Sequence, residues 1–481
     1  MRMIRAAALS LALMAPPAGA LAQATAASAP TAEEQDAYAR EALAYSEALQ
    51  AYVFCFPLMI TERERARRER LTGPLPNEPA APINQLGHMT QLATARGDLP
   101  YSPNNDTVYT GIALDLTREP VILHMPDIRD RYVSVQVADA YIENQPYLYS
   151  TRVNGGRAMN IAFVGPDWRG RLPRGVTEAR VSTNLTSIAV RIAVRDEADL
   201  ANVRRYQGQM SLTALSDWRG RPGATPPAPP PPRARTQYEG DFAYFRRAAD
   251  LMIDNPPPPK HAAMRAMMRR IGLVPGQPFD PDGLDPATRA GVLRAERDGP
   301  ALINLVRRGR GTPTPTGWTA NRASNDVDVD YPTRAGNALV GLMGNDPEEA
   351  LYYNVFFDGA GEALHGGRAY RVHFAADEIP QTGALGFWSL TMYDAQRFQF
   401  IDNPINRYAI GSRDALVRNA DGSIDIYVQP TAPEGERAAN WLPSPASGDF
   451  KLTIRVYMPT PAMVAAYRGQ TLRVPPVEPA G

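Results

Sequence analysis

Carboxylate, amide and hydroxyl side chains crowd the stretch SPNNDTVY in the N-terminal half of the chain. Asp106 stands at the mouth of an expected strand, where a carboxylate whose pKa is shifted by burial can act as a general acid or base. Amide and hydroxyl groups beside it can orient a substrate through hydrogen bonds. We therefore predict that Asp106 is catalytic. The substrate-binding residues predicted beside it are Asn104, Asn105, Thr107 and Tyr109.

Further carboxylates and arginines flank expected strands elsewhere in the chain. Arg131 and Asp139 bracket one strand, and Asp394 precedes the turn of a hairpin in the C-terminal half. Two carboxylates across a cleft can divide the roles of acid and base, and an arginine beside them can bind an anionic group through two hydrogen bonds. Asp139 and Asp394 complete the predicted catalytic set. The other predicted substrate-binding residues are Arg131, Tyr141, Trp388, Tyr393 and Arg407.

A structural interpretation of the same residues competes with the functional one. Asn-Asn-Asp and Asp-Asn-Pro sequences commonly cap turns, because their side chains bond to nearby backbone groups. Pairs of arginine and aspartate also lock the loops of sandwich folds. The sequence leaves both interpretations open.

The stretch at 385–407 shows how such residues are positioned. Residues 385–393 alternate between a face with hydroxyl and aromatic groups and a face with Trp388, which predicts a half-buried strand. A turn and a return strand over 397–401 would complete a hairpin, and the proline-containing loop 402–407 then leaves the sheet. One interpretation is a core hairpin that ends in a structural loop. The other is a pocket lined by the hydroxyl face with Asn403, Asn406 and Arg407.

Metal, cofactor and nucleophile motifs are missing from the sequence. No nucleophile elbow, phosphate-binding loop, His-Glu-x-x-His or Cys-x-x-Cys motif occurs, and the five histidines are scattered. Cys55 is the single cysteine, so no intrachain disulfide can form, and its apolar surroundings predict a buried thiol. The oxygen-rich stretch with Asn325, Asp326, Asp328 and Asp330 lacks the glycine and final glutamate of an EF-hand. We therefore predict neither a metal nor a cofactor.

Composition narrows the classes of partner. The 481 residues include 51 Lys and Arg and 51 Asp and Glu, so the formal net charge is zero. Such a chain has no overall field that favours nucleic acid or an anionic membrane. A small-molecule or glycan ligand is expected instead, and exposed strand edges leave a homo-oligomer open.

The N-terminus predicts export. Residues 1–22 combine two arginines, a short apolar core and a small-x-small cleavage site, as in a secretory signal peptide. The apolar core is too short to span a bilayer, and no other long apolar run occurs, so no membrane span is expected. We expect a periplasmic or secreted protein.

Periodicity divides the remaining chain into four parts. Thr31 and Glu34 form a capping-box sequence before a helix over 31–70. Short apolar runs between turn residues predict an N-terminal β-sandwich domain over 71–220. A proline-rich linker and helical region follow over 221–345, and a C-terminal β-sandwich domain covers 346–481. The predicted class is α+β, mainly β, with two antiparallel, jelly-roll-like sandwiches, an N-terminal helix and a helical insertion.

Individual elements follow from the same patterns. The expected strands span 108–116, 120–125, 132–139, 160–165, 176–181, 188–194, 350–357, 369–374, 424–429 and 451–458. The expected helices span 199–215, 262–271 and 286–308.

Several long motifs resemble a known family. The runs SPNNDTVYTGIALDL, PVILHMPDIRDRYVSVQVADAY and VGPDWRGRLP are similar to the domain of unknown function numbered 1254. FWSLTMYD, NPINRYAIGSR, DGSIDIYVQ and NWLPSP are similar to the domain numbered 1214, which follows it in paired proteins. The resemblance covers nearly the whole mature chain and implies two β-sandwich domains with helices at the start and in the middle. It supplies no catalytic set.

Two functions are consistent with these observations. The first is an exported enzyme, a hydrolase acting on an extracellular glycan or small organic compound by carboxylate acid/base chemistry. The second is a periplasmic ligand-binding or envelope-assembly protein without turnover. A sandwich fold serves both, so the choice depends on the site.

Overall fold

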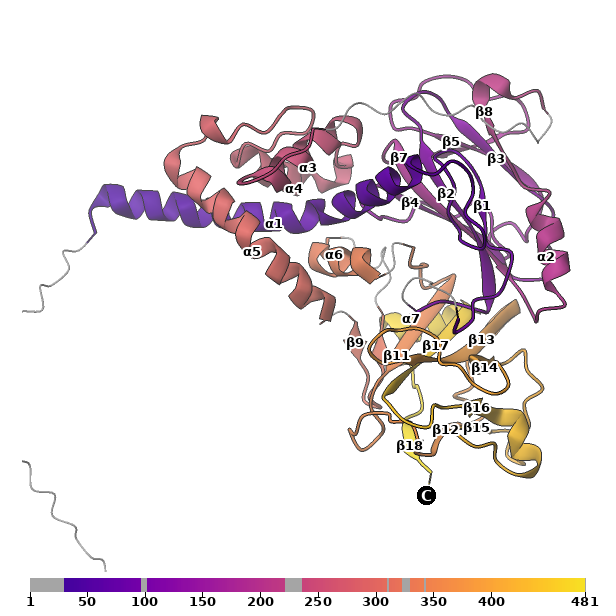
Figure 1. The fold of residues 1–481 in the computed structure, drawn as a ribbon. Coiled ribbons are helices and arrows are strands. Elements are labelled where there is room, and N and C mark those ends of the chain that lie inside the picture. Colours follow the sequence, from indigo (N-terminus) through magenta and orange to yellow (C-terminus); the bar gives the residue numbers. More distant parts are fainter. Residues whose placement is uncertain are drawn as a thin grey trace, which may run out of the picture.

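The computed structural model describes residues 30–96, 102–220, 236–308, 311–321, 329–340 and 343–480 (Figure 1). The predicted signal peptide 1–22 and the proline-rich stretch 221–232 lie outside these ranges. So do Asn325, Asp326 and Asp328 of the oxygen-rich stretch.

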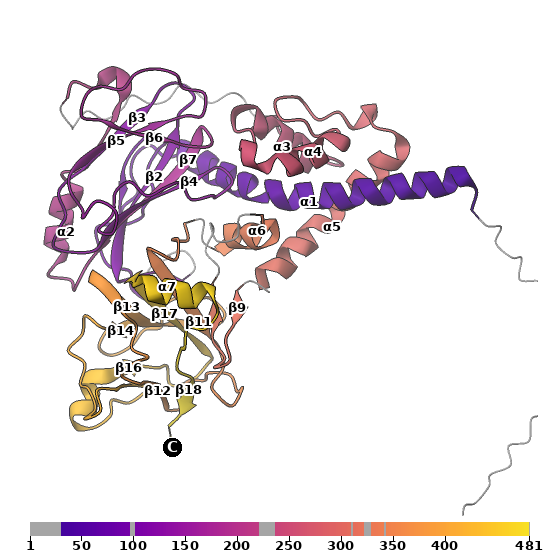
Figure 2. The ribbon, with the colours of Figure 1, turned by 180° about the vertical axis from the view of Figure 1, so that it is seen from behind.

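Helix α1, Ala32–Glu69, runs along the helical layer and ends at the N-terminal sandwich (Figures 1 and 2). It begins as predicted, because the Thr31 hydroxyl accepts from the Glu34 amide and the Glu34 carboxylate accepts from the Thr31 amide. Helix α5 packs closely along it. Gly291 and Gly299 make this approach possible, since a Cβ at either position would collide with α1.

The other helices of this layer cover the middle of α1 and bury one apolar cluster with it. Cys55 lies in that cluster, fully buried, and burial raises its thiol pKa to about 12. Among the described residues, α1 is the helix long and apolar enough to cross a membrane, but 61% of its most apolar window is buried inside the protein. The bounds are α3 Ala243–Asp254, α4 Ala262–Arg270, α5 Pro286–Arg308 and α6 Tyr331–Val340.

The N-terminal sandwich packs two four-stranded sheets around one apolar core. The first sheet has the order β1-β2-β7-β4, and the second β6-β5-β3-β8. All pairings are antiparallel except β5 with β6. The bounds are β1 Gly87–His88, β2 Thr107–Asp115, β3 Val121–Met125, β4 Val133–Asp139, β5 Met159–Val164, β6 Thr177–Arg180, β7 Leu185–Ala193, α2 Leu200–Gln207 and β8 Ser211–Ala214.

The C-terminal sandwich has a six-stranded sheet, β14-β13-β17-β11-β10-β9, and a four-stranded sheet, β16-β15-β12-β18. Its core lies between them, and helix α7 closes one end. The bounds are β9 Thr312–Pro313, β10 Thr319–Ala320, β11 Ala350–Val355, β12 Tyr370–Phe374, β13 Thr382–Asp394, β14 Ala409–Gly411, β15 Ile424–Gln429, β16 Trp441–Pro443, β17 Phe450–Pro459, α7 Pro461–Arg468 and β18 Val477–Pro479. Short 3₁₀ helices span Leu215–Asp217, Pro259–His261, Pro281–Gly283 and Gly435–Asn440.

The observed class is mixed α+β with two sandwich-like pairs of sheets, as predicted. Two elements differ from expectation. The return strand predicted at 397–401 is wrong: β13 pairs instead with β14, because Phe398 takes a φ of 55° and turns the chain out of the ladder. The helix predicted over 199–215 ends at Gln207, and β8 follows it.

The outward face of the N-terminal sheet β1-β2-β7-β4 meets that of the six-stranded C-terminal sheet. On β7, Val190 and Ile192 enter the N-terminal core, so Arg191 points to the opposite face. On β17, Ile454 and Val456 enter the C-terminal core, so Arg455 also points away from it. Both arginines are buried, because each outward face is covered by the other domain and the loops between them. We call this region the interdomain polar layer.

Candidate functional site

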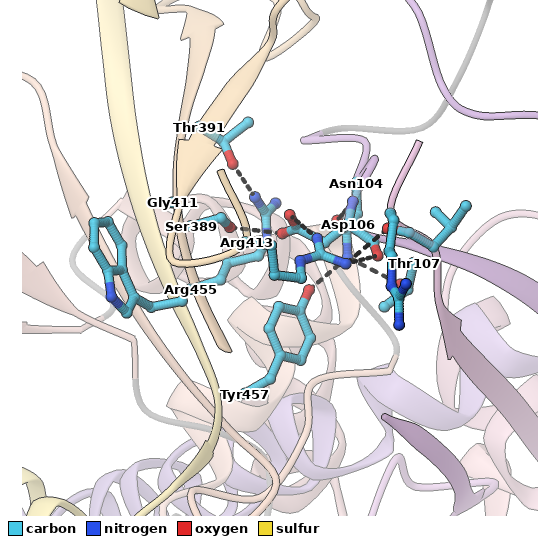
Figure 3. Close-up of polar contacts among 12 residues, drawn as sticks. Asn104, Asp106, Thr107, Ser389, Thr391, Gly411, Arg413, Arg455 and Tyr457 are labelled. Carbon is cyan, nitrogen blue, oxygen red and sulfur yellow. Dashed lines mark hydrogen bonds and ion pairs between the residues drawn. The ribbon is translucent and has the colours of Figure 1, made fainter. Parts of the chain in front are cut away.

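Asp106 joins the two domains in this layer. Its Oδ2 accepts a hydrogen bond from Ser389 Oγ at 2.6 Å, and its Oδ1 accepts from an Arg413 guanidinium nitrogen at 3.0 Å. Arg413 also donates to the Val194 carbonyl at 2.7 Å. Figure 3 shows the carboxylate between these groups. Both oxygens of Asp106 are therefore engaged by residues of the C-terminal domain.

Asn104 makes a second contact across the layer. Its amide nitrogen donates to the hydroxyl of Tyr457 at 2.7 Å and to that of Tyr109 at 3.0 Å (Figure 3 labels Asn104 and Tyr457). Its amide oxygen accepts from the Asp106 backbone at 2.8 Å, as in an Asx turn. The turn thus aims both side chains at the neighbouring domain.

Arg455 lies deeper, on β17, and is 5% exposed. It donates to the hydroxyls of Thr391 at 3.0 Å and Tyr393 at 2.6 Å. Tyr393 in turn donates to the Pro103 carbonyl at 2.6 Å. The hydroxyl face of β13 predicted from its alternation therefore holds an arginine and a loop of the other domain.

Arg191 is the counterpart on β7 and is 4% exposed. It donates to the Gln136 side-chain oxygen at 2.6 Å, to Asn345 Oδ1 at 3.1 Å and to the Met343 carbonyl at 2.6 Å. Its guanidinium carbon lies 5.3 Å from the centre of the Tyr109 ring. This distance is within the range of a cation–π contact.

The two guanidinium groups act on the phenol of Tyr109. Burial alone would raise the Tyr109 pKa, but Arg191, hydrogen bonds from Asn104 and Thr107, and Arg455 bring it below its ordinary value. Burial dominates at Tyr393 and raises that pKa to about 12. Because of these cations, Tyr109 is the phenol that ionises most readily in this layer. Its side chain is partly exposed.

The charge of the layer is not balanced locally. Within the described part of the chain, neither Arg191 nor Arg455 forms an ion pair with a carboxylate, since all their hydrogen bonds go to hydroxyl, amide and carbonyl groups. Asp106 attracts Arg455 but is bonded to Arg413. In general, guanidinium groups bind anions, and a phenol whose pKa is lowered can transfer a proton.

The other predicted carboxylates lie far from Asp106. Asp106 is next to the end of β7 at Ala193, whereas Asp139 pairs with Thr186 towards the opposite end of that strand. The pair made by Val133 and the pair made by Asp139 are six residue steps apart along β4, roughly 20 Å at the usual rise. Asp394 caps a turn by accepting from the amides of residues 396 and 397. The three carboxylates do not face one cleft.

The remaining predicted binding residues do not converge on one place. Arg131 pairs with Asp130 and Asp199 at the edge of the N-terminal sandwich. Tyr141 donates to the Asn255 carbonyl at 2.9 Å, against the helical layer. Trp388 is 2% exposed inside the C-terminal core, Arg407 donates to backbone carbonyls at 439 and 441, and Asn105 is partly exposed beside Asp106.

Thr107 and Tyr109 share the layer with Asp106 and Asn104, so the N-terminal motif is brought together as a group. The sequence interpretation missed Arg191, Arg455, Arg413 and Tyr457. A signal was present, because Arg191 and Arg455 each interrupt a strand of apolar residues, in SIAVRIAV and LTIRVYM. A lone charge in such a strand marks either a solvated face or a buried polar layer.

Two family profiles match the chain in the predicted order. The first, a protein of unknown function (DUF1254), matches residues 83–214, and the second, a protein of unknown function (DUF1214), matches residues 349–461. The chain belongs to this paired family. The first match contains β7 with Arg191, and the second contains β17 with Arg455, so the layer forms where DUF1254 and DUF1214 are in contact.

A solved structure has the same fold. The chain is similar to the VPA0106 protein from Vibrio parahaemolyticus, with a TM-score of 0.70 and 22% identity, over 91% of this chain and 100% of that one. This similarity shows the fold. A putative uncharacterized protein from Burkholderia cenocepacia gives a TM-score of 0.41 at 12% identity, over 93% and 95% of the two chains. Among curated proteins, no sequence matches.

Proposed function

We propose that this chain is an exported hydrolase that acts on a small organic anion in the interdomain polar layer. The supporting observation is the pair of buried arginines, Arg191 and Arg455, without carboxylate partners among the described residues. A buried cation is costly unless it is paired. An anionic group of a ligand would supply the missing charge. The signal-like residues 1–22 support export.

Tyr109 is the proposed proton-transferring group. Its pKa is lowered by Arg191 and Arg455, which favours the phenolate that can take a proton from an attacking water molecule. The same guanidinium groups would stabilise negative charge that develops on the substrate. Tyr109 thus replaces the carboxylate pair expected from the sequence, because both oxygens of Asp106 are already engaged.

Binding of simple anions tests the site. Inorganic phosphate, acetate and benzoate would each be titrated into the purified protein by calorimetry at pH 7. We expect saturable binding of at least one probe, and at least about tenfold weaker binding in Arg191→Met and in Arg455→Met. Arg371→Met is the matched control, because Arg371 is exposed on β12 and pairs with Glu478.

Thermal melts would establish that each variant is folded, and Arg455→Lys retains the charge if the methionine variant does not fold. Affinity unchanged by both arginine substitutions overturns the proposal, as does the absence of saturable binding by all three anions.

Turnover separates the enzyme from a binding protein. The 4-nitrophenyl monoester of succinic acid carries a free carboxylate, and its hydrolysis releases a coloured phenolate. Loss of a general base costs about 10²–10⁴-fold in rate, so Tyr109→Phe should lower kcat by that factor while benzoate still binds. Equal kcat in Tyr109→Phe would end this role for Tyr109.

A ligand-binding protein without turnover is the second candidate. It is favoured by the engagement of Asp106 in the contact between domains, which leaves no free carboxylate base beside the arginines in the described layer. Saturable anion binding without product from a panel of carboxylate esters and amides would support it over the hydrolase.

A further inference from the structure

The loop from Asp139 to Tyr147, here called the junction loop, contacts three parts of the molecule. It leaves the N-terminal sandwich at the end of β4. Glu143 contacts the helical layer through His261 Nε2 at 2.6 Å. Asn144 donates to Asp346 Oδ1 at 2.8 Å, and Tyr147 donates to Asn345 Oδ1 at 3.1 Å, in the segment just before β11 of the C-terminal sandwich. A change in this loop therefore reaches all three parts.

Asp139 organises the start of the loop. Its Oδ1 accepts from the backbone amides of Tyr141 and Glu143, both at 2.9 Å. Its Oδ2 is buried without a hydrogen-bond partner in the described structure, and the residue is 1% exposed. A buried carboxylate oxygen without a donor strongly disfavours the ionised form.

The charged groups around Asp139 come from three elements. Glu143 belongs to the same loop, Arg334 comes from α6, and Lys260 and His261 precede α4. All three basic residues contact the Glu143 carboxylate, His261 and Lys260 at 2.6 and 2.7 Å. Arg334 also acts on Asp139 and lowers its pKa, but less strongly than Glu143 raises it. In the described structure Asp139 therefore lies beside a carboxylate and forms no ion pair of its own.

We propose that the junction loop is a proton-operated joint, closed while the Asp139 carboxyl carries a proton and loosened when it ionises. The neutral acid fits a buried position with one unpartnered oxygen and a neighbouring carboxylate. The ionised acid does not, and solvation of its charge requires the loop to move away from the helical layer.

The direction of the pH effect follows from linkage. Burial, and then Glu143, raises the Asp139 pKa from 3.8 to about 7. The closed loop therefore holds the proton more tightly than an open loop, and closure weakens as pH rises from about 4 to about 7. Burial would also raise the Glu143 pKa, but His261, Arg334 and Lys260 lower it to about 2, so Glu143 stays charged across this window.

The joint is connected to the polar layer. Gln136 donates to Asn144 Oδ1 at 2.8 Å in the junction loop, and it accepts from Arg191 at 2.6 Å. Asn345 contacts both Tyr147 and Arg191. Opening of the loop would displace groups that hold Arg191, so the proton on Asp139 should strengthen anion binding. This second step rests on the proposed function.

Hydrogen exchange on the full mature protein without ligand tests the joint. We expect the protection factors of the Tyr141 and Glu143 amides to fall by up to about tenfold per pH unit between pH 5 and pH 7, and then to level off. Asp139→Asn, which stays neutral, should show no such slope. Asp358→Asn is the matched control and should leave the junction-loop profile as in the parent, because Asp358 holds two amides in a comparable loop elsewhere.

A flat profile in the parent overturns the proposal, and so does an equal slope in Asp139→Asn. If Asp139→Asn does not fold, the carboxyl carbon shift of Asp139 in the parent decides, and a titration midpoint below pH 5 overturns the joint. Benzoate affinity at pH 5.5 and 7.5 tests the coupling, with weaker binding expected at 7.5 in the parent alone. A pH-dependent loop in a protein that binds no anion would refute the proposed function and leave the joint intact.

Discussion

The two sandwiches contain the same loop in two different environments. Asp139 and Asp358 each hold the backbone amides two and four residues ahead, at 2.9–3.0 Å. In both loops the residue just before the aspartate forms a β-bridge with the residue five positions after the aspartate. These bridges join Ala138 to Asn144 and Phe357 to Ala363. Both also read Asp-x-x-x-Glu. The backbone geometry is therefore independent of the surroundings.

The two loops differ in how deeply they are buried. Glu362 in the C-terminal copy is exposed, whereas Glu143 is 3% exposed and bonded to His261 and Arg334. The helical layer covers only the N-terminal copy. An ordinary turn motif thus becomes a charged junction because helices pack over it, and the unpartnered Asp139 oxygen is a consequence of that cover.

The fourth residue of each loop shows the same contrast. Gly361 has a φ of 87°, and Ile142 occupies the corresponding position with a φ of 57°. A β-branched residue rarely adopts this conformation, which costs of order 1–3 kcal/mol. Ile142 is 2% exposed and packs with Ile60 and Ala338 of the helical layer. Packing across the junction therefore offsets backbone strain in the copy that we propose to move.

The largest expected effect comes from the two glutamates. Glu143→Gln removes the buried carboxylate that pairs with His261, Arg334 and Lys260, and removal of one partner of a buried pair costs about 3–5 kcal/mol. Glu362→Gln changes an exposed side chain and should stay within about 0.5 kcal/mol. Urea denaturation at pH 7 measures both. Similar values for the two variants would show that the helical cover does not distinguish the loops.

Replacement of Asp139 and replacement of Asp358 should lower the free energy of unfolding by amounts that depend differently on pH. At pH 5, Asp139→Ala and Asp358→Ala each leave two backbone amides without their acceptor, at a cost of about 1–3 kcal/mol. At pH 7.5 the cost of Asp139→Ala should shrink, because the raised Asp139 pKa makes the parent less stable there. Denaturation at the two pH values checks this, and an equal cost of Asp139→Ala at both would contradict it.

The sequence predicts much of the fold because its signals are local. The capping box at Thr31 and Glu34 and the alternation of 385–393 each specify one element, and both elements form. Asp106 also lies at the mouth of β2 among polar neighbours, as the sequence predicts. Such features depend on residues near one another in the chain.

The features that the sequence does not predict depend on which distant parts of the chain pack over a residue. Arg191 and Arg455 occupy outward strand positions, which are usually solvated, and they are buried because the other domain and the segment that leads into it cover them. Asp139 and Asp358 begin loops with the same sequence pattern. Nothing near either loop in the sequence indicates that the helical layer, with His261 and Arg334, covers the Asp139 loop and leaves the Asp358 loop uncovered. The predicted pairing of Asp106 with Asp139 is wrong for the same reason. Both residues lie at strand ends in the sequence, but these positions are at opposite ends of one sheet.

The smallest expected effect isolates the backbone strain that Ile142 carries and that glycine avoids at position 361. No heavy atom lies within 4 Å of a Cβ added at Gly361, so Gly361→Ala tests the backbone alone and should cost about 1 kcal/mol. Gly73→Ala is the matched control, since its Cβ would also enter open space and its φ is not in the left-handed region. That variant should be neutral or slightly stabilising. Equal denaturation midpoints would mean that the left-handed residue costs little in this loop, and the packing of Ile142 would then offset no strain.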